Sequence, residues 1–317
     1  MPDAPLNPPI EIAPHHAETI LRQWLGEAVR CTELRSLSGG CCYTVMEVLF
    51  DHPRSPVVLK ASHTRDDDGL QHQFRTLGFF EQHTSFPMPR ALHCDLSRGS
   101  VPFAYILMTR LPGTNLSEAA AWMTPADRVR IERQIADAVG ELHDHTGPHF
   151  GSIHAATGCT RWIDCFRPKL EENFIGVRDS GLVSARSLTR IEKLLGRLDS
   201  LLDVPGPPVM VHGDIWATNI IVSGSPGSAR RPLRSQLSGF VDGGGDYAHH
   251  EYELAYLEVW QTVGPEFFTR YTLRHPLADG YHGRKLIYWL NTLLLHVWLF
   301  RSQGYVDAVE RLSARIM

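Results

Sequence analysis

The segments VHGDIWATN at residues 211–219 and GFVDG at residues 239–243 decide how this chain is interpreted. The first carries Asp214 and, five residues later, Asn219, while the second places Asp242 directly after an apolar stretch. Carboxylate and amide oxygens are ligands that Mg²⁺ prefers, and a further carboxylate can take a proton from a hydroxyl. The spacing therefore indicates a catalytic loop beside a metal site. The alternative is a polar turn with a capping aspartate and a solvated asparagine.

The same spacing occurs in protein kinases, whose catalytic loop reads H-R-D-x-x-x-x-N and whose metal-binding aspartate opens D-F-G. This chain is similar, with H-G-D-x-x-x-x-N and V-D-G. The similarity implies that Asp214 is the catalytic residue, which orients an attacking hydroxyl and takes its proton. It also implies that Asn219 and Asp242 hold Mg²⁺ against the phosphates of ATP. A protein substrate is not favoured, because the Arg of H-R-D is missing and no APE-type segment follows Asp242.

Composition is that of a globular protein and argues against several other classes. The chain has 317 residues, of which 43% are hydrophobic and 21% charged, and its formal net charge is -4. Without a broad basic field, no nucleic-acid partner is expected. The apolar run 286–300 is too short for a membrane span and contains polar residues, so a buried helix is expected and no membrane partner. The N-terminus has no visible secretory signal and the six cysteines no zinc spacing or C-x-x-C pair, so we expect a cytoplasmic protein.

Alternating apolar residues and turn signals predict a first lobe built on an antiparallel sheet. Residues 1–16 are rich in proline and are expected to form a flexible leader. A helix is expected at 17–29 and another at 70–83. The expected strands are 33–37, 43–50, 57–60, 90–95 and 103–109. Residues 110–113, RLPG, break this pattern and resemble a hinge, so the first lobe is expected to span 17–110.

The second lobe, 111–317, is expected to be mainly helical. Thr124, Pro125 and Asp127 are typical of a capped helix start. Further helices are expected at 162–174 and 185–202. Two short strands, 219–222 and 237–241, should flank the catalytic motif, joined by a loop rich in Gly, Ser and Arg.

Several first-lobe residues are candidates for binding the nucleotide. Gly39, Gly40 and Cys41 lie between two expected strands, where glycines let backbone amides approach phosphate closely. Lys60 ends the strand VVLK and resembles the phosphate-contacting lysine of V-A-I-K. Each feature alone is also typical of an ordinary turn or strand end, but their order along the chain supports a nucleotide site. Met108 and Arg110, in the hinge, are the remaining candidates.

These residues together resemble the aminoglycoside phosphotransferase superfamily of small-molecule kinases. The segments LGFFEQHTSFPMPRAL at 77–92 and YILMTRLPG at 105–113 are similar to its first lobe. HGDIWATN resembles the HGDLW-x-x-N of the fructosamine (ketosamine) kinase branch. DGGGDYAHHEYELA at 242–255 resembles that branch's metal aspartate followed by Tyr-x-His-x-Glu-Tyr-Asp/Glu-Leu-Ala. The similarity covers roughly residues 30–310.

The resemblance implies an α+β, bilobal, protein-kinase-like fold that binds ATP and Mg²⁺. It implies a kinase that phosphorylates a hydroxyl of an amino-sugar-like small molecule, first of all a ketosamine such as fructosamine or ribulosamine. An aminoglycoside, another antibiotic or a choline-like alcohol is the alternative acceptor. A nucleotide-binding pseudokinase is the alternative of another class. We expect a monomer or a weak homodimer.

Two departures from the family pattern affect these expectations. The helix glutamate that pairs with the strand lysine should fall at Gln73, which can hydrogen-bond Lys60 but supplies no charge. Residues 243–245, GGG, should be flexible directly after the metal aspartate. Both motivate the pseudokinase alternative.

Candidates for binding the acceptor have structural alternatives of equal or greater weight. Trp216 could form an aromatic wall or pack beneath the loop, and Glu251 could bind an amine or charge the first turn of a helix. Glu253 is expected to brace the catalytic loop. The four acceptor candidates are Trp216, Asp246, Glu251 and Trp298.

Overall fold

A computed structural model of the chain describes residues 7–37, 42–62, 68–224 and 235–316. The chain divides into two compact units, and each is built from two segments. The first comprises Met1–Met123 and Thr218–Gly244, and the second comprises Thr124–Ala217 and Gly245–Met317. The first unit therefore takes in residues 111–123 and 218–244 in addition to the lobe expected at 17–110.

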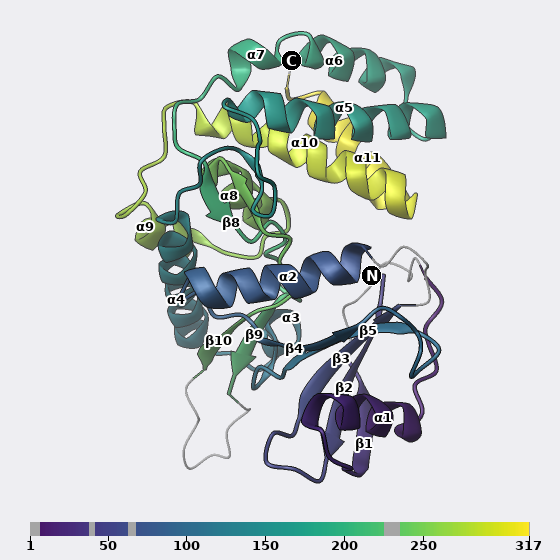
Figure 1. Ribbon diagram of the computed structural model, residues 1–317. Coiled ribbons are helices and arrows are strands. Elements are labelled where there is room, and N and C mark those ends of the chain that lie inside the picture. Colours follow the sequence, from purple (N-terminus) through teal and green to yellow (C-terminus); the bar gives the residue numbers. More distant parts are fainter. Residues whose placement is uncertain (1–6, 38–41, 63–67, 225–234, 317) are drawn as a thin grey trace. The chain divides into compact units, whose positions relative to one another are not determined.

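The first unit contains a five-stranded antiparallel sheet with the strand order β1-β2-β3-β5-β4 (Figure 1). Each expected strand is present and its ends lie within two residues of the expected ones. The strands are β1 (Cys31–Ser36), β2 (Thr44–Phe50), β3 (Val57–Ser62), β4 (Ala91–Asp95) and β5 (Ala104–Thr109).

Period-two alternation divides the side chains of the sheet between two hydrophobic clusters. Val57, Leu59 and Ala61 of β3 pack with helix α1 (Pro14–Leu25), whereas Val58 packs with helix α2 (Asp68–His83). Lys60 is two residues from Val58 and therefore shares its face. This register turns Lys60 away from the α1 side of the core.

The segment before α1 is ordered where the structure describes it, in contrast to the expected flexible leader. Ile10 is buried in the α1-side cluster, its backbone N–H donates to Thr44 Oγ1 at 2.7 Å, and Asn7 donates to the Cys42 carbonyl at 2.9 Å. The helix begins at Pro14, where proline's fixed φ suits the first turn, and ends at Gly26 in the left-handed conformation. Residues 1–6 of the expected leader lie outside the described residues.

A second, three-stranded sheet explains why the first unit takes in residues 218–244. Strands β9 (Ile220–Ser223) and β10 (Gln236–Phe240) pair as a hairpin, and β9 also pairs with β6 (Thr114–Asn115), which precedes the short helix α3 (Leu116–Ala119). The pairing partners Thr114 and Val222 are more than one hundred residues apart in sequence. No local pattern signals such a pairing.

The second unit is mainly helical, as predicted (Figure 1), and contains a large cluster of buried hydrophobic residues. The Thr124 hydroxyl accepts the Asp127 N–H at 3.1 Å, which confirms the predicted helix start. The helix expected at 185–202 is interrupted near Gly196 and forms two. The helices are α4 (Pro125–His143), α5 (Trp162–Ser180), α6 (Ala185–Leu195), α7 (Leu198–Leu201), α8 (His250–Val259), α9 (Pro265–Tyr271), α10 (Tyr281–Phe300) and α11 (Gln303–Ser313).

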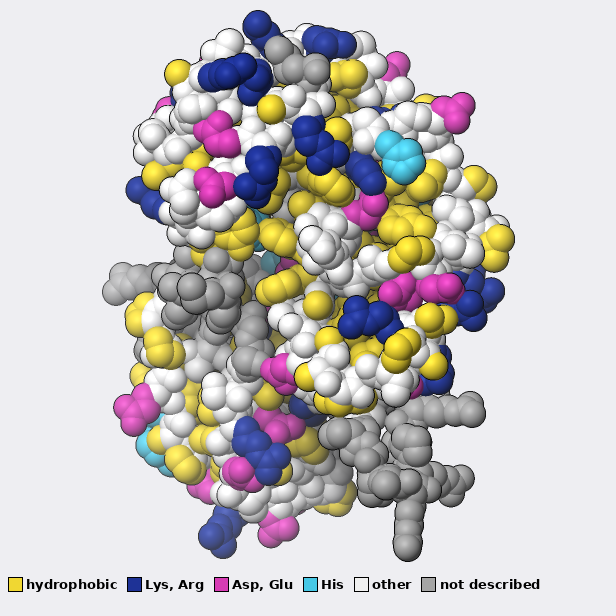
Figure 2. Space-filling view, turned by 180° about the vertical axis from the view of Figure 1, so that it is seen from behind, with side chains coloured by type: hydrophobic (Ala, Val, Ile, Leu, Met, Phe, Trp, Pro, Cys, Tyr) yellow, Lys and Arg dark blue, Asp and Glu magenta, His cyan; other side chains and the backbone are white. Residues whose placement is uncertain are grey.

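A small sheet with the order β7-β11-β8 lies in the same unit. Its strands are β7 (Gly151–Ser152), β8 (Val209–Val211) and β11 (Asp246–Ala248), so β8 leads directly into the HGD motif. The long helix α10 contains buried Asn291, whose Oδ1 accepts from Asn173 at 3.0 Å. Within the described ranges, no helix has the length and apolarity needed to cross a membrane. On the face shown in Figure 2, basic and acidic side chains of the described residues are interspersed.

Candidate functional site

Lys60 is a buried cation held by the first unit. Only 5% of the residue is exposed, and its ammonium lies 4.7 Å from the centre of the Tyr43 ring. Its Nζ donates to Asp242 Oδ1 at 2.8 Å. A buried lysine is stable when it is paired in this way. The predicted phosphate-binding lysine and a predicted metal ligand therefore lie in direct contact.

The β9–β10 hairpin brings Asn219 and Asp242 together. Ile220 pairs with Phe240 at the end of the ladder, and the Val241 N–H then donates to the Asn219 carbonyl at 2.9 Å. Asp242 follows with a φ of 64°, a left-handed conformation that few non-glycine residues adopt. Asn219 is buried, whereas 31% of the Asp242 side chain is exposed. The open end of the hairpin thus carries both an amide and a carboxylate.

Gln73 of α2 completes this cluster in a way that the sequence did not predict. Its Nε2 donates to Asp242 Oδ1 at 2.8 Å, so Lys60 and Gln73 hold the same carboxylate oxygen. The other side-chain atom, Oε1, is buried with no hydrogen-bond partner in the described part of the chain. Gln73, which was expected to pair with Lys60, therefore contacts Asp242, the residue with which Lys60 pairs.

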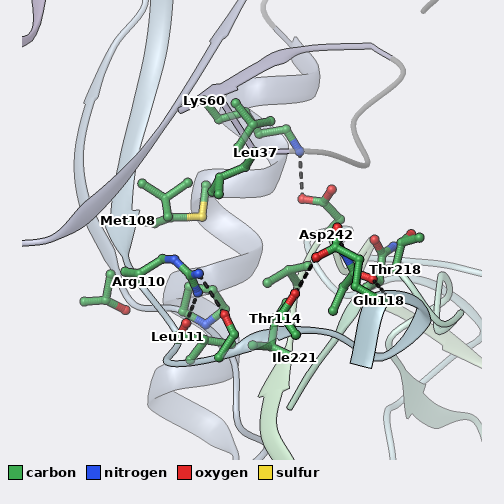
Figure 3. A pocket seen from close by; sticks show the side chains of 18 residues that line it. Leu37, Lys60, Met108, Arg110, Leu111, Thr114, Glu118, Thr218, Ile221 and Asp242 are labelled. Atoms are coloured by element: carbon green, nitrogen blue, oxygen red, sulfur yellow. Dashed lines mark hydrogen bonds and ion pairs between the residues drawn. The ribbon is translucent and has the colours of Figure 1, made fainter. Parts of the chain in front are cut away.

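Lys60, Asn219 and Asp242 line a cavity of about 830 Å³, counting the space open to solvent, that lies within the first unit (Figure 3). Its apolar wall includes Leu37, Val45, Val58 and Ile221, and its polar end includes Lys60, Asn219 and Asp242. An apolar slot with a few convergent polar groups is the usual form of a small-ligand site. The cavity is therefore suited to a flat apolar group joined to an anion.

The hinge contributes Met108 and Arg110 to the same cavity. Arg110 Nε donates to Glu47 Oε1 at 2.9 Å, and its other nitrogens donate to the carbonyls of Gly113 and Leu111 (Figure 3). The guanidinium is therefore committed to fixing the hinge backbone. The predicted Gly39, Gly40 and Cys41 lie outside the described residues.

In the second unit, Glu253 of α8 holds the backbone of the HGD loop. The N–H groups of Gly213 and His212 donate to its carboxylate at 2.6 and 3.2 Å, and His143 Nε2 donates at 3.1 Å. Burial alone would raise the pKa of Glu253, but these donors and the nearby histidines outweigh it and hold that pKa below 4.5. The predicted bracing role of Glu253 is confirmed.

Asp214 belongs to this loop and has a partner that the sequence interpretation missed. The Tyr256 hydroxyl, also on α8, donates to Asp214 Oδ1. The Asp214 N–H donates to His212 Nδ1 at 3.3 Å. The spacing of 253 and 256, which places both residues on one side of a helix, was a signal that could have identified Tyr256.

The four acceptor candidates occupy different environments. Trp216 is half-buried in the loop, and Asp246 pairs with Lys169 at 2.9 Å. Glu251 is fully buried, and both of its oxygens accept from Arg284, at 2.6 and 2.7 Å, so it has a structural role rather than the predicted contact with an acceptor. Trp298 is 37% exposed and packs over Gly176 on the surface of α5 and α10. The structure therefore does not gather these four side chains into one pocket.

The donors around Asp242 fit a magnesium ion. Asn219 and Asp242 supply hard oxygen atoms at the polar end of the cavity, and the exposed part of Asp242 is accessible. Lys60 beside them supplies a positive charge for phosphate. This combination is chemically appropriate for a metal-bound nucleotide.

The sequence matches a model of the Phosphotransferase enzyme family over residues 33–283. Since the match covers most of the chain, the protein belongs to this family of phosphotransferases.

Among individual relatives, a probable ketoamine kinase of Enterococcus faecium is 26% identical over 226 residues, 67% of this chain and 75% of that protein. The ketosamine-3-kinase of Mus musculus is 28% identical over 107 residues, 34% of this chain and 31% of the mouse protein.

Solved structures share the fold. A candidate fructosamine-3-kinase from Haemophilus somnus superposes with a TM-score of 0.74 at 17% identity, covering 95% of this chain and 96% of that one. The aminoglycoside phosphotransferase APH(4)-Ia, in a complex with AMP-PNP and hygromycin B, has a TM-score of 0.65 at 16% identity, with coverages of 95% and 97%. The predicted α+β, protein-kinase-like fold and the predicted resemblance to both groups are confirmed.

Proposed function

We propose that this protein is an ATP- and Mg²⁺-dependent kinase that phosphorylates a hydroxyl of a ketosamine. The observation that carries the proposal is the cavity of the first unit, in which Lys60, Asn219 and Asp242 converge at the end of an apolar slot. Membership of the phosphotransferase family supports the reaction class. The similarity to proteins named ketoamine and ketosamine kinases supports the acceptor.

In this proposal the first unit binds the nucleotide. The base lies among the apolar residues near Met108, and Lys60 binds phosphate oxygens. Asn219 and Asp242 would hold Mg²⁺, which supplies charge to offset that of the transferring phosphoryl group. Gly39, Gly40 and Cys41 are proposed to aim backbone amides at the phosphates, and Arg110 to fix the hinge.

Asp214 is proposed to accept the proton of the acceptor hydroxyl. The hydroxyl oxygen forms a bond to the γ-phosphorus of ATP, the bond from phosphorus to the bridging oxygen breaks, and ADP leaves. Glu253 supports the step by fixing the backbone that carries Asp214. Trp216 is proposed as a wall for the acceptor. Whether the protein is a monomer or a weak homodimer stays a prediction.

An aminoglycoside acceptor is the second candidate, because APH(4)-Ia shares the fold and was solved with hygromycin B. The similarity in sequence to proteins named ketoamine and ketosamine kinases favours the ketosamine. Of the two departures that motivated the pseudokinase alternative, Gln73 supports Asp242 through its amide and leaves Lys60 paired.

The test is ADP formation from MgATP with fructoselysine, ribuloselysine, several aminoglycosides and choline, for the natural protein and Asp214→Ala. We expect turnover on a ketosamine that falls by at least about a hundredfold in Asp214→Ala. Turnover on an aminoglycoside alone would reject the ketosamine. Binding of MgADP without turnover on any acceptor would reject the kinase and favour a pseudokinase.

A further inference from the structure

One tyrosine of the second unit contacts the side chain of Asp214 directly. Tyr256 lies near the end of α8, 42 residues after Asp214, and its hydroxyl donates to Asp214 Oδ1. Tyr256 lies outside the HGD-x-x-x-x-N motif and outside the segment 242–255 on which the family resemblance rests. It is therefore a feature of this chain that the motifs do not include.

We propose that Tyr256 is a positioning residue for phosphoryl transfer, which fixes the rotation of the Asp214 carboxylate so that it meets the acceptor hydroxyl. This inference rests on the proposed function, because it takes Asp214 as the group that receives the proton. Tyr256 itself acts through Asp214 and need not touch the acceptor.

Helix α8 supports the HGD loop at two points that are three residues apart. Glu253 binds the backbone N–H groups of His212 and Gly213, and Tyr256 binds the side chain of Asp214. Residues at positions i and i+3 lie on the same side of a helix. One helix face thus fixes the main chain of the loop and also its functional carboxylate, and a small rotation of the carboxylate would be resisted by the tyrosine.

The helix itself is firmly attached within the unit, where α8 packs against α10 and β8 (Figure 1). Trp289 of α10 donates its Nε1–H to the carbonyl of Ala255, next to Tyr256, at 2.8 Å. Lys285 of α10 pairs with Glu258 of α8 at 2.7 Å. The position from which the tyrosine reaches Asp214 is therefore held from both sides of residue 256.

Aromatic neighbours restrict the ring of Tyr256. Trp260 meets it edge-on at a centroid distance of 6.2 Å. The Trp260 ring in turn lies beside those of His296 on α10 and Tyr305 on α11, at centroid distances of 4.7 and 6.1 Å. A ring packed in this way keeps one rotamer, so its hydroxyl is a fixed donor.

Tyr256 also stays protonated. Burial is the largest cause of a pKa well above the ordinary value of tyrosine, and the negative charge of Asp214 raises that pKa further. The hydroxyl therefore donates throughout the neutral range. Because a misplaced base can cost about a hundredfold in rate, a fixed donor on Asp214 has a direct kinetic consequence.

The experiment is a double-mutant cycle with Tyr256→Phe, Asp214→Ala and the combined variant. Tyr256→Phe removes one hydroxyl and keeps the ring. We expect kcat on fructoselysine to fall about tenfold to thirtyfold while KM for ATP stays within twofold. In the Asp214→Ala background the same change should have no further effect on kcat, because its partner is already absent.

Tyr288→Phe is the matched control. Tyr288 is buried in the same unit, and its hydroxyl accepts from Trp162 Nε1 at 3.0 Å, a partner that does not belong to the HGD loop. The kcat of Tyr288→Phe should remain within twofold of the natural value even if the melting temperature of this variant falls. Equal losses of kcat in Tyr256→Phe and Tyr288→Phe would show that Tyr256 acts only through packing and would overturn the inference.

The unfolding equilibrium of the natural protein and of the three variants in the cycle tests the contact between Tyr256 and Asp214 without any acceptor. Tyr256→Phe should change the unfolding equilibrium constant by about tenfold in the natural background and little in Asp214→Ala. Additive effects would overturn the inference and leave the proposed function standing. Coupled effects together with silence on every acceptor would retain the contact and reject the proposed function.

Discussion

Gln73 illustrates, at the scale of one residue, how a departure from a family pattern can be compensated. A carboxylate at this position would face Asp242 rather than a free lysine, because Gln73 Nε2 and Lys60 Nζ both lie 2.8 Å from Asp242 Oδ1. An amide is the side chain of this length that can donate to a carboxylate. The neutral glutamine therefore avoids a second negative charge beside Asp242.

The first prediction is that Gln73→Glu weakens binding of MgADP, although it restores the glutamate of the family pattern. The new carboxylate would lie within hydrogen-bonding distance of Asp242 and repel it, with a cost of about 1–2 kcal/mol after allowance for the exposure of Asp242 and the nearby Lys60. We expect the Kd for MgADP, measured by calorimetry, to rise about tenfold. Gln71→Glu, an exposed change on the same helix, is the control and should bind normally. Tighter binding of MgADP by Gln73→Glu would contradict this prediction and show that the glutamine impairs the site.

At the scale of elements, α8 and the β9–β10 hairpin position the functional side chains. The hairpin ends in a left-handed Asp242, and α8 holds the HGD loop through Glu253. The hairpin has Asn219 and Asp242 at its open end, whereas α8 carries Glu253 within the helix. Their stability should therefore control activity as well as folding.

The second prediction concerns Glu253→Gln. Replacing a buried carboxylate that accepts three hydrogen bonds should lower the free energy of unfolding by about 2 kcal/mol at pH 7 and lower kcat at least tenfold, because the HGD loop is released. Circular-dichroism melting and steady-state kinetics measure the two effects. Glu192→Gln, an exposed change on α6, should alter neither.

The pH dependence of that variant follows from the sign of the shift. The pKa of Glu253 is below 4.5 in the folded protein, so its stabilising contribution is complete above pH 4.5 and is lost as the pH falls toward the folded value. The melting temperature of Glu253→Gln should therefore decline less steeply below pH 4.5 than that of the natural protein. Parallel curves over this range would show that Glu253 is not held ionised.

The elements themselves could largely be predicted from the sequence, whereas their partners could not. A short apolar run that follows a turn predicts a strand such as β3, and Thr124 with Asp127 predicts a helix start, because both signals are local. The pairing of β6 with β9, the contact of Gln73 with Asp242 and that of Tyr256 with Asp214 join residues 42 to 169 positions apart. Such contacts depend on tertiary packing, so the motif identified the chemistry but not the residues that hold it in place.

At the scale of the whole molecule, the chain passes from one unit to the other within its main motif. Asp214 lies three residues before the end of the segment Thr124–Ala217, whereas Asn219 is the second residue of Thr218–Gly244. The described lining of the cavity, including Lys60, Asn219 and Asp242, comes entirely from the first unit. In the proposed function, binding of the nucleotide and proton transfer from the acceptor therefore depend on residues of different units.

The last prediction tests this division with two alanine variants. Lys60→Ala removes a charge from the cavity and should raise the Kd for MgADP at least about tenfold, since a charged contact to phosphate contributes roughly 1.5–3 kcal/mol. Asp214→Ala, in the second unit, should bind MgADP within twofold of the natural protein. Lys193→Ala, a change on the exposed side of α6, controls for the loss of a lysine. Because all three Kd values come from titration with MgADP alone, they need no acceptor, and a tenfold weakening in Asp214→Ala would show that the second unit contributes to nucleotide binding after all.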